Sequence, residues 1–588
     1  MQLAQSPFLN ILSDQKVQDT LKLMGRSPSD RLTPEVAREL CQRAGSKAYL
    51  SGSIASLGSQ YVIGLKAVNC QTGDSITQEQ TTANGKEHVL KALDGAATKL
   101  REKVGESLGT IQKFATPLEQ ATTPSLEALQ AYSLGRKTLN DNVVSTDAVR
   151  LFQRAITLDP NFAMAYASLG ASYDNLEETG LAAENMRKAY ELRERVSERE
   201  KSYIESHYYD QVTGDAEKAC QVYELWSQAY PRDDLPPYQL TGWYADLGQH
   251  DKALAEARET VRVDPDAGSY ARLAAAYSNL NRLEEARASL EEARAKDPDS
   301  PQLHGVQYYF DFLQNDAEGM AQQVAWSAGK PGAEDLSLMD QSFTEAYFGH
   351  IGKARESLRQ AVDSAERSEE KARAAVHKAD AAETDAEYGN SERAHQEAAA
   401  ALALSSTRDV RVRAAAAMAR AGDSARAEKM ADQLSKEFPQ NTIVNRIAVP
   451  IIRAAIEINR NNPGKTVEVL QTVSPYELGE ADSLYSVYLR GQAYLLLRQG
   501  KEAATEFQKI LDHRSIVLNY SQGALAHLGL AGAYVMQGDT AKARAAYQDF
   551  LTLWKDADPD IPILKQAKAE YAKLDLSSTT LPADRPHR

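Results

Sequence analysis

The sequence is poor in cysteine and in basic charge. Its 588 residues include three cysteines, Cys41, Cys70 and Cys220, which are too few and too dispersed for a zinc site or a disulfide framework. Two interpretations stay open: three small buried side chains, or a Cys41–Cys70 bridge, which implies an oxidising compartment. The formal net charge is −15, and this argues against a nucleic-acid partner, which needs a basic surface.

Long apolar runs are also missing. No stretch approaches 18 apolar residues, so we expect no transmembrane helix in this chain. Residues 1–7 lack the basic start and apolar run of a signal peptide. If Met1 is the true start, the protein is therefore expected in the cytoplasm.

The motifs of common enzymes are each broken at a named position. Residues 462–466, NPGKT, end like a phosphate-binding loop, but Asn459 stands where that loop needs its first glycine. His513-Arg514 precedes Ser515 instead of the catalytic Asp of a kinase, and no histidines have HExxH spacing. We predict no catalytic residues, no cofactor and no metal site.

What the sequence does have is a helical hairpin between residues 270 and 298. Tyr270, Leu273 and Tyr277 recur at three and four residues, which places them on one face of a helix. Ala286, Leu290 and Ala293 resume this spacing after Asn279 and Asn281. Asp297-Pro298 then ends the second helix, because proline excludes the preceding residue from α geometry.

The same pattern repeats along the chain. Asp264-Pro265 precedes Asp297-Pro298 by 33 residues, and a fixed period of this length indicates stacked helical pairs. Further copies are Leu169-Gly170, Tyr173, Ala182, Met186 and Ala189; Gly491, Tyr494, Ala503, Phe507 and Ile510; and Leu530-Ala531, Tyr534, Gly538, Ala543, Tyr547 and Phe550. These residues resemble the tetratricopeptide repeat (TPR). The predicted fold class is mainly α: a right-handed TPR-type α-solenoid preceded by a small α/β domain.

The first part of the chain does not follow the repeat. We predict a strand at 7–12, helices at 14–24 and from Pro34 to Gly45, strands at 48–56, 60–69 and 75–82, and a helix at 86–108. The residues of this region, Tyr49 to Ile54, Gly58, Tyr61 to Ile63 and Thr72 to Asp74, resemble the TolB N-terminal/FlgO-like family. Compared with the domains of that family, the chain is expected to lack the first strand and the first helix.

The combination of this domain with a TPR array is similar to the carboxy-terminal region of bacterial receptor-like serine/threonine kinases. In those proteins a kinase domain and one membrane span come first. This resemblance implies a periplasmic or otherwise extracytoplasmic location as part of a longer membrane-anchored protein.

The expected domain organisation follows from these patterns. We place a TolB-N/FlgO-like domain at 1–115, a linker at 116–124, an array of about twelve helical pairs at 125–560, a capping helix at 561–575 and a disordered tail at 576–588. Within the second pair, the helix from Leu181 is expected to run on through a charged stretch to Arg199.

The candidate binding residues lie in the last two repeats. In TPR arrays the concave face is lined by fixed positions of the first helix of each pair, and here these positions are unusually apolar. They are Tyr485, Tyr488, Leu495, Leu496, Leu525, Leu528, Val535 and Met536. One interpretation is a groove for an apolar peptide or helix; the other is that neighbouring repeats bury these side chains.

The sequence thus predicts a non-catalytic scaffold for protein or peptide partners. One alternative is the extracytoplasmic sensor region of a serine/threonine kinase whose catalytic domain is absent from this chain. Another is an envelope assembly or secretion accessory.

Overall fold

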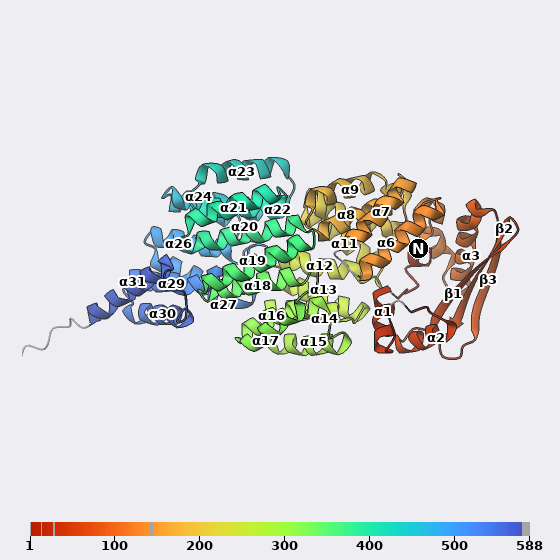
Figure 1. Cartoon of the computed structure of the whole chain (residues 1–588), viewed down its shortest axis with the longest axis horizontal. Helices are drawn as coiled ribbons and strands as arrows, with labels where there is room; N and C mark the ends of the chain where they lie inside the picture. The colour runs from red at the N-terminus through yellow and green to blue at the C-terminus, as the bar shows by residue number, and fades with distance from the viewer. Residues whose placement is uncertain (1, 13, 28–29, 142–144, 579–588) are drawn as a thin grey trace, which may run out of the picture. The chain divides into compact units, whose positions relative to one another are not determined.

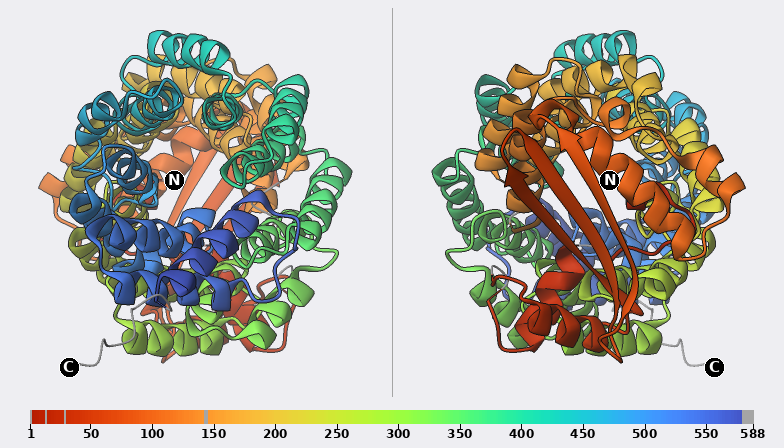
Figure 2. Two further views of the ribbon diagram at one scale, coloured as in Figure 1. Left: turned by 90° about the vertical axis from the view of Figure 1, so that its left-hand side faces the viewer. Right: turned by 90° about the vertical axis from the view of Figure 1, so that its right-hand side faces the viewer.

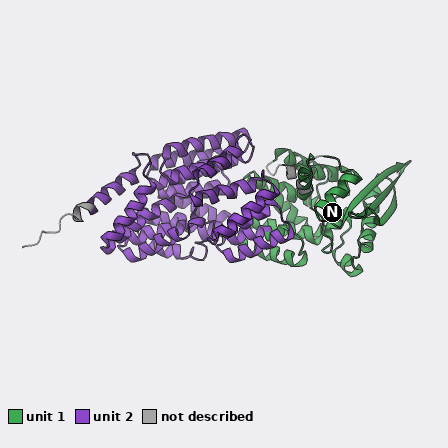
Figure 3. Cartoon of the chain, turned by 90° about the horizontal axis from the view of Figure 1, so that it is seen from below, with its two compact units in different colours: residues 1–237 green, residues 238–588 purple. Residues whose placement is uncertain are grey.

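The computed structural model describes residues 2–12, 14–27, 30–141 and 145–578. The chain divides into two compact units, residues 1–237 (unit 1) and 238–588 (unit 2), coloured green and purple in Figure 3. The predicted boundaries at residues 115 and 125 both fall inside unit 1. Helices dominate the chain, and a small sheet lies near its amino terminus (Figure 1), so the predicted fold class is confirmed.

Unit 1 begins with an antiparallel sheet and short helices. The elements are η1 (Leu3–Gln5), α1 (Asp14–Leu23), α2 (Pro34–Arg43), β1 (Ala48–Leu57), β2 (Gln60–Asn69), β3 (Ser75–Asn84), η2 (Lys86–His88), α3 (Val89–Lys103), α4 (Leu108–Phe114) and α5 (Leu118–Ala121). The strand order is β1-β2-β3. The helix α3 packs against β2 and β3, where Ile63, Ala83 and Val89 form a small core.

Two of the predicted elements in this region are wrong. Residues 7–12 form no strand, because the Ser6 hydroxyl accepts hydrogen bonds from the N–H groups of Phe8 and Leu9 and turns the chain. The helix predicted at 86–108 is interrupted after Lys103. Gly105 adopts φ +102°, and Ser107 caps the separate helix α4.

The region of the predicted linker is structured in part. Residues 116–124 include α5, and Leu118 is buried. The N–H of Leu118 donates to Asp94 Oδ1 at 3.1 Å, which attaches this segment to α3.

A fully buried ion pair holds the amino terminus of unit 1 in place. Arg101 of α3 donates from Nε and Nη2 to the two oxygens of Glu106 at 2.8 and 2.7 Å, and both side chains have no exposed surface. Ser6 also donates to Glu106, at 2.7 Å, and Arg101 Nη1 donates to the carbonyl of Gln2 at 3.4 Å. The pair therefore fixes η1 and the following turn against α3.

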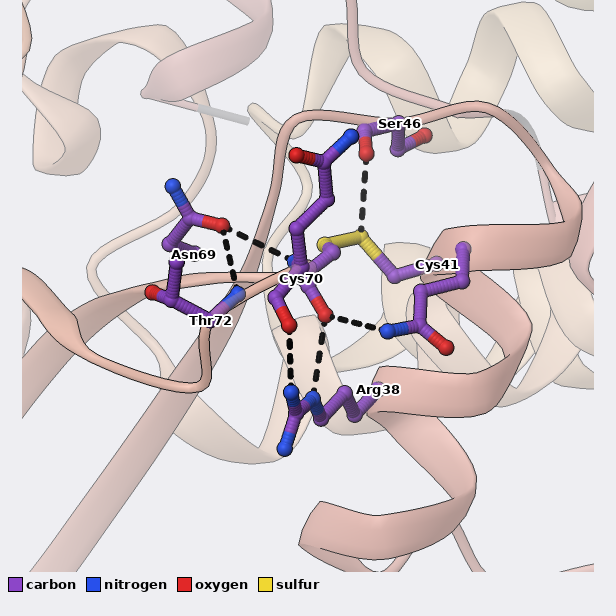
Figure 4. Close-up of a disulfide and its surroundings, with 8 residues drawn as sticks. Arg38, Cys41, Ser46, Asn69, Cys70 and Thr72 are labelled. Carbon is purple, nitrogen blue, oxygen red and sulfur yellow. Dashed lines mark hydrogen bonds between the residues drawn. A yellow bond between two sulfur atoms is a disulfide. The ribbon is translucent and has the colours of Figure 1, made fainter.

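Cys41 and Cys70 form a disulfide (Figure 4), so the bridged interpretation is the one observed. Their Cα atoms lie 5.9 Å apart, within the range that a disulfide spans. Arg38 Nε and Gln42 Nε2 both donate to the Cys70 carbonyl, at 3.0 and 2.8 Å. The bridge thus ties α2 to the end of β2. Cys220 is buried and is not part of a disulfide.

The rest of unit 1 consists of helical pairs. They are α6 (Leu126–Asp141) with α7 (Thr146–Leu158), α8 (Ala163–Asn175) with α9 (Thr179–Glu191), and α10 (Glu198–His207) with α11 (Ala216–Ala229), separated by η3 (Arg193–Arg195) and the π-helical turn η4 (Tyr208–Thr213). The continuous helix predicted from Leu181 to Arg199 is wrong. Ser197 and Glu200 form a capping box that starts α10 as a new helix.

Unit 2 continues the pairs from α12 (Leu235–Asp246), whose residues lie on both sides of the division between the units. The following elements are α13 (His250–Val263), α14 (Ala267–Asn279), α15 (Leu283–Lys296), α16 (Pro301–Gln314), α17 (Ala317–Ser327), α18 (Glu334–Tyr347), α19 (Ile351–Arg367), α20 (Lys371–Glu387), α21 (Ser391–Leu404), α22 (Arg408–Arg420), α23 (Ser424–Glu437), η5 (Val444–Ala448), α24 (Val449–Asn459), α25 (Pro463–Gln471), α26 (Tyr485–Leu496), α27 (Gly500–Asp512), α28 (Arg514–Val517), α29 (Ser521–Gln537), α30 (Thr540–Leu553) and α31 (Pro562–Ser578).

In the left-hand view of Figure 2, the green-to-blue helices of unit 2 curve around a common axis. The helix predicted at 561–575 corresponds to α31 and extends three residues further, to Ser578. The disordered tail predicted at 576–588 is therefore wrong for residues 576–578, which are helical, and its remainder lies outside the described residues.

Small residues set the distance between the helices of a pair. A Cβ atom at Gly491 of α26 would lie 2.8 Å from the ring of Phe507 on α27, and Gly135 and Phe152 stand in the same relation in α6 and α7. Since real Cβ atoms do not approach so closely, a larger residue at either glycine would push the two helices apart. This is the physical basis of the small residue at this position of the repeat pattern.

Two late segments of unit 2 dock onto much earlier helices. Trp554, 1% exposed, donates from its indole nitrogen to the Tyr347 carbonyl at 2.9 Å, and a Cβ at Gly349 would lie 2.6 Å from the Ala557 side chain. In the second segment, the Leu478 carbonyl lies 2.7 Å from His250 Nε2, and the N–H of Glu480 donates to the Ala245 carbonyl at 3.1 Å. Unit 2 is therefore closed by contacts between residues about two hundred positions apart.

Candidate interaction surfaces

Four large apolar side chains are exposed where α26 and α29 end. Leu496 is 49% exposed, Val535 43% and Met536 47%. Leu497, which the sequence reasoning did not include, is 39% exposed. Leu496 lies on α26, Leu497 directly follows that helix, and Val535 and Met536 lie on α29, which packs against α26. We call these four residues the apolar patch.

The other predicted binding residues lie deeper. Tyr488 and Leu525 are buried, at 4% and 2% exposed, within the core of unit 2. Tyr485, Leu495 and Leu528 are half-buried, and the Tyr485 hydroxyl donates to Glu387 of α20. The eight predicted residues therefore do not share one open surface. Leu496, Val535 and Met536 are available to a partner, whereas Tyr488 and Leu525 are covered by neighbouring repeats.

A row of charged residues joins α20 to α22. Arg413 Nε donates to Asp380 Oδ1 at 2.7 Å, and Arg420 donates to both oxygens of Glu387 at 2.5 and 2.9 Å. Glu387 also accepts the bond from Tyr485, so this row connects the middle of unit 2 with its last repeats.

A third carboxylate of this row, Glu383, forms no ion pair with Arg413 or Arg420, which pair with Asp380 and Glu387. It lies between Asp380 and Glu387 on α20, but the residues between Arg413 and Arg420 on α22 are alanines and one methionine. Glu383 has no hydrogen-bond or ion-pair partner among the described residues. Burial, and then the nearby carboxylate of Asp380, raise the pKa of Glu383 to about 8.

Two further carboxyl groups of unit 2 have pKa values raised to about 7. Burial raises the pKa of Asp340 to about 7, although the Tyr309 hydroxyl donates to it at 2.6 Å. Burial also raises the pKa of Asp482 to about 7, against the opposing effect of hydrogen bonds from Ser486. Asp482 is only 4% exposed.

From the raised pKa values of Asp340, Glu383 and Asp482 we predict that the free energy of unfolding of unit 2 falls as the pH rises from 5 to 8. An unfolded aspartate or glutamate has a pKa of about 4, so a raised folded pKa stabilises the fold fully below that value. The contribution is lost as the pH rises through the folded pKa, about 7 for Asp482 and about 8 for Glu383. For the buried Asp482, the free energy of unfolding should fall by up to about 1.4 kcal/mol per pH unit.

Urea denaturation at pH 5, 6, 7 and 8 measures this slope. Asp482→Asn should flatten it, because the amide does not ionise. Asp251→Asn, at an exposed carboxyl of α13, is the matched control and should leave the slope unchanged. Equal slopes for Asp482→Asn and the unmodified protein contradict the prediction.

The charged row was accessible to sequence reasoning in part. Asp380, Glu383 and Glu387 recur at three and four residues, and Arg413 and Arg420 at seven, so each set lies on one helix face. Their pairing depends on the packing of α20 against α22, and the contact with Tyr485 joins residues 98 positions apart.

The described residues offer little else for chemistry. Among them, no group of His, Cys, Asp and Glu side chains is placed to hold a metal ion. In the part of the chain that the structure covers, no helix has the length and apolar character needed to cross a membrane.

A cavity of about 300 Å³ lies against α17, α18 and α19. Two carboxylates line it, and both have partners: Glu334 accepts bonds from Gly329, Ser364 and Arg367, and Asp363 accepts one from Arg359.

Stacked antiparallel helical pairs with small residues at their contacts define this protein as a TPR-like α-solenoid. Residues 244–301 and 487–560 match the tetratricopeptide repeat family model, and the chain carries tetratricopeptide repeats in these two stretches. The first stretch includes the hairpin at residues 270–298, and the second includes the apolar patch. The resemblance of residues 1–115 to TolB/FlgO-like domains stays a prediction.

Solved TPR structures are similar to this chain at low sequence identity. The TPR domain of P58(IPK) is 14% identical, covering 77% of this chain and 99% of its own, with a TM-score of 0.21. Yeast Tom70 is 13% identical, covering 77% and 96%, with a TM-score of 0.24. The APC/C hetero-tetramer Cut9-Hcn1 is 12% identical, covering 83% of this chain and 94% of its own, with a TM-score of 0.38. With TM-scores below 0.5, these likenesses carry no argument about partners.

Proposed function

We propose that this chain is a non-catalytic scaffold that binds protein or peptide partners at the apolar patch of unit 2. The observation that carries the proposal is the exposure of Leu496, Leu497, Val535 and Met536 at the ends of α26 and α29, two helices that pack against each other. Large apolar side chains grouped on a surface mark interaction sites. The partner that fits is a peptide or amphipathic helix with apolar side chains, because the patch contains no charged group to pair with.

Charge reversal on the patch tests this function. We expect the double variant Leu496→Glu/Val535→Glu to weaken capture of partner proteins at least tenfold, because a partner's apolar side chains would meet two carboxylates. Stability should change by less than about 0.5 kcal/mol per site, since both side chains are exposed. The measurement is affinity capture with quantitative mass spectrometry, followed by titration of the recovered partner.

The matched control is Leu225→Glu on α11, where the leucine is 58% exposed but lies outside the patch. This variant should retain all partners. An identical set of partners for the patch variant and the unmodified protein contradicts the proposed function.

A second candidate is the extracytoplasmic sensing region of a receptor-like serine/threonine kinase. The Cys41–Cys70 disulfide favours it, because such bonds persist in oxidising compartments and are rare in the cytoplasm. Fractionation of cells, followed by alkylation of the thiols in denaturant, tests this candidate. One alkylated thiol per chain, that of the buried Cys220, in an extracytoplasmic fraction is expected; three alkylated thiols in the cytosol contradict it. Reading the upstream DNA for an in-frame kinase and membrane span completes the test.

A further inference from the structure

The strand β1 is an edge of the sheet in unit 1. In the order β1-β2-β3 it pairs only with β2, so one row of its peptide groups has no partner strand. Residues 50–57 are all exposed, which leaves both faces of this segment open as well. The three neighbouring strands can be followed in the right-hand view of Figure 2.

Two apolar side chains of β1 are exposed on the face of the sheet that is otherwise buried. Leu50 lies opposite Ala67, and Ile54 lies opposite Ile63, and residues directly opposite in an antiparallel pair share one face. Ala67 and Ile63 are 1% and 4% exposed, whereas Leu50 is 47% and Ile54 60% exposed. The apolar face of the sheet therefore continues onto β1 without a helix over it.

β1 has none of the features that normally prevent strand pairing at an edge. Its ten residues, AYLSGSIASL, contain no charge and no proline, and the irregularity of the sheet lies between β2 and β3. The opposite edge differs, because β3 is mostly polar and its Glu79 pairs with Lys103. The sheet is thus protected on one edge and open on the other.

We propose that β1 pairs with β1 of a second copy of this chain, giving a two-fold symmetric dimer with a continuous six-stranded sheet. The pairing is antiparallel with Gly52 facing Gly52 of the second copy. This register places Leu50 opposite Ile54 of the second copy on both sides of the axis. A shift that brings Gly52 opposite Ile54 pairs Leu50 with Ser56 and loses both apolar matches.

The backbone directions agree with this register. Leu57 and Gln60 flank the two-residue turn Gly58-Ser59, so they form a hydrogen-bonded pair, and the odd-numbered residues of β1 direct their peptide groups toward β2. The even-numbered residues direct theirs to the free edge. These are the residues that face each other when Gly52 lies on the axis.

Electrostatics favour this strand as the contact. Each chain carries a formal charge of −15, so two copies repel each other across most possible contacts. β1 contributes no charge, and therefore the sheet edge lets two copies meet without like charges in opposition.

Sedimentation velocity of the full chain at 1–100 μM tests the dimer. We expect a species of twice the 64.5 kDa chain mass. Ile54→Lys should raise the dimer dissociation constant at least 100-fold, because it replaces both apolar matches and places a charge beside each strand. Leu57→Lys is the matched control: this leucine is 71% exposed, lies on the other face and stands outside the paired stretch. It should leave the dimer intact.

A charge-pair variant tests the register itself. In Leu50→Glu/Ile54→Lys each introduced carboxylate faces an introduced ammonium of the second copy. The dimer dissociation constant of this double variant should therefore be at least tenfold lower than that of Ile54→Lys alone.

Hydrogen exchange of the peptide covering 48–57 provides a readout in the unmodified protein, and exchange should slow as concentration rises. A single-chain mass at 100 μM overturns the inference, as does a dimer that Ile54→Lys leaves unchanged or a complex only with a different protein. None of these results bears on the apolar patch, whose test is separate.

Discussion

Replacing Trp554 with alanine is expected to lower the free energy of unfolding of unit 2 by about 3–5 kcal/mol, the range for removal of a buried tryptophan. The indole is 1% exposed and packs edge-on against Tyr388, with ring centroids 5.4 Å apart. Its loss leaves a cavity between the end of α30 and the earlier helices α18 and α20. It also leaves the Tyr347 carbonyl, which accepts the indole N–H, without that partner.

Urea denaturation followed by far-ultraviolet circular dichroism measures this effect. Trp326→Ala is the matched control, because that indole is half-buried on α17 and its loss should cost less than about 1 kcal/mol. Limited proteolysis adds a local readout, since cleavage near residues 554–558 should accelerate in Trp554→Ala. Equal stability of the two variants contradicts the role of Trp554 in closing unit 2.

Replacing Arg101 with methionine should destabilise unit 1 by about 3–5 kcal/mol, the range for breaking a buried pair by removing one partner. The change leaves Glu106 buried and charged without its two guanidinium hydrogen bonds. Burial by itself raises the pKa of Glu106, but the bonds from Arg101 and Ser6 outweigh it and hold the pKa below its ordinary value. A lowered folded pKa stabilises the fold above about pH 4, and this stability is lost as the pH falls through the folded pKa.

Two further variants separate pairing from packing at this site. Arg101→Met/Glu106→Gln should recover part of the loss, because the remaining side chain carries no charge. Arg43→Ala removes an exposed i,i+4 pair with Glu39 and should cost less than about 0.5 kcal/mol. Thermal unfolding at pH 7 and pH 4 distinguishes the variants. A double variant no more stable than Arg101→Met contradicts the buried-charge explanation.

The sequence was sufficient for the helical pairs because their signals are local. Ala286, Leu290 and Ala293 recur at helical spacing and are all buried, and each pair closes within about 30 residues. The strands at 48–57 and 60–69 were also predictable to within a few residues from their Tyr, Val and Ile content, and the strand at 75–84 from the turn that precedes it.

The errors arose where a local signal was overlooked or where distant contacts decide. The capping box of Ser197 and Glu200 is visible in the sequence, but the charged stretch around it contains no proline and by its composition predicts a continuous helix. The apolar run at 7–12 has strand-like composition, but the N–H groups of Phe8 and Leu9 donate to the Ser6 hydroxyl and the chain turns there. Of the two interpretations left open for Tyr488 and Leu525, burial by neighbouring repeats is the one observed, and periodicity could not decide it because it does not specify how the repeats stack.

The closing contacts of unit 2 bear on its mechanical behaviour. A solenoid with contacts only between neighbouring repeats extends under tension like a soft spring and peels apart from one end. In unit 2 the Trp554–Tyr347 bond spans 207 residues and the His250–Leu478 bond spans 228. A pulling force applied to the ends of this unit must break these two contacts before the solenoid can lengthen. We therefore expect the unit to extend little at low force and then to lengthen abruptly once the contacts break.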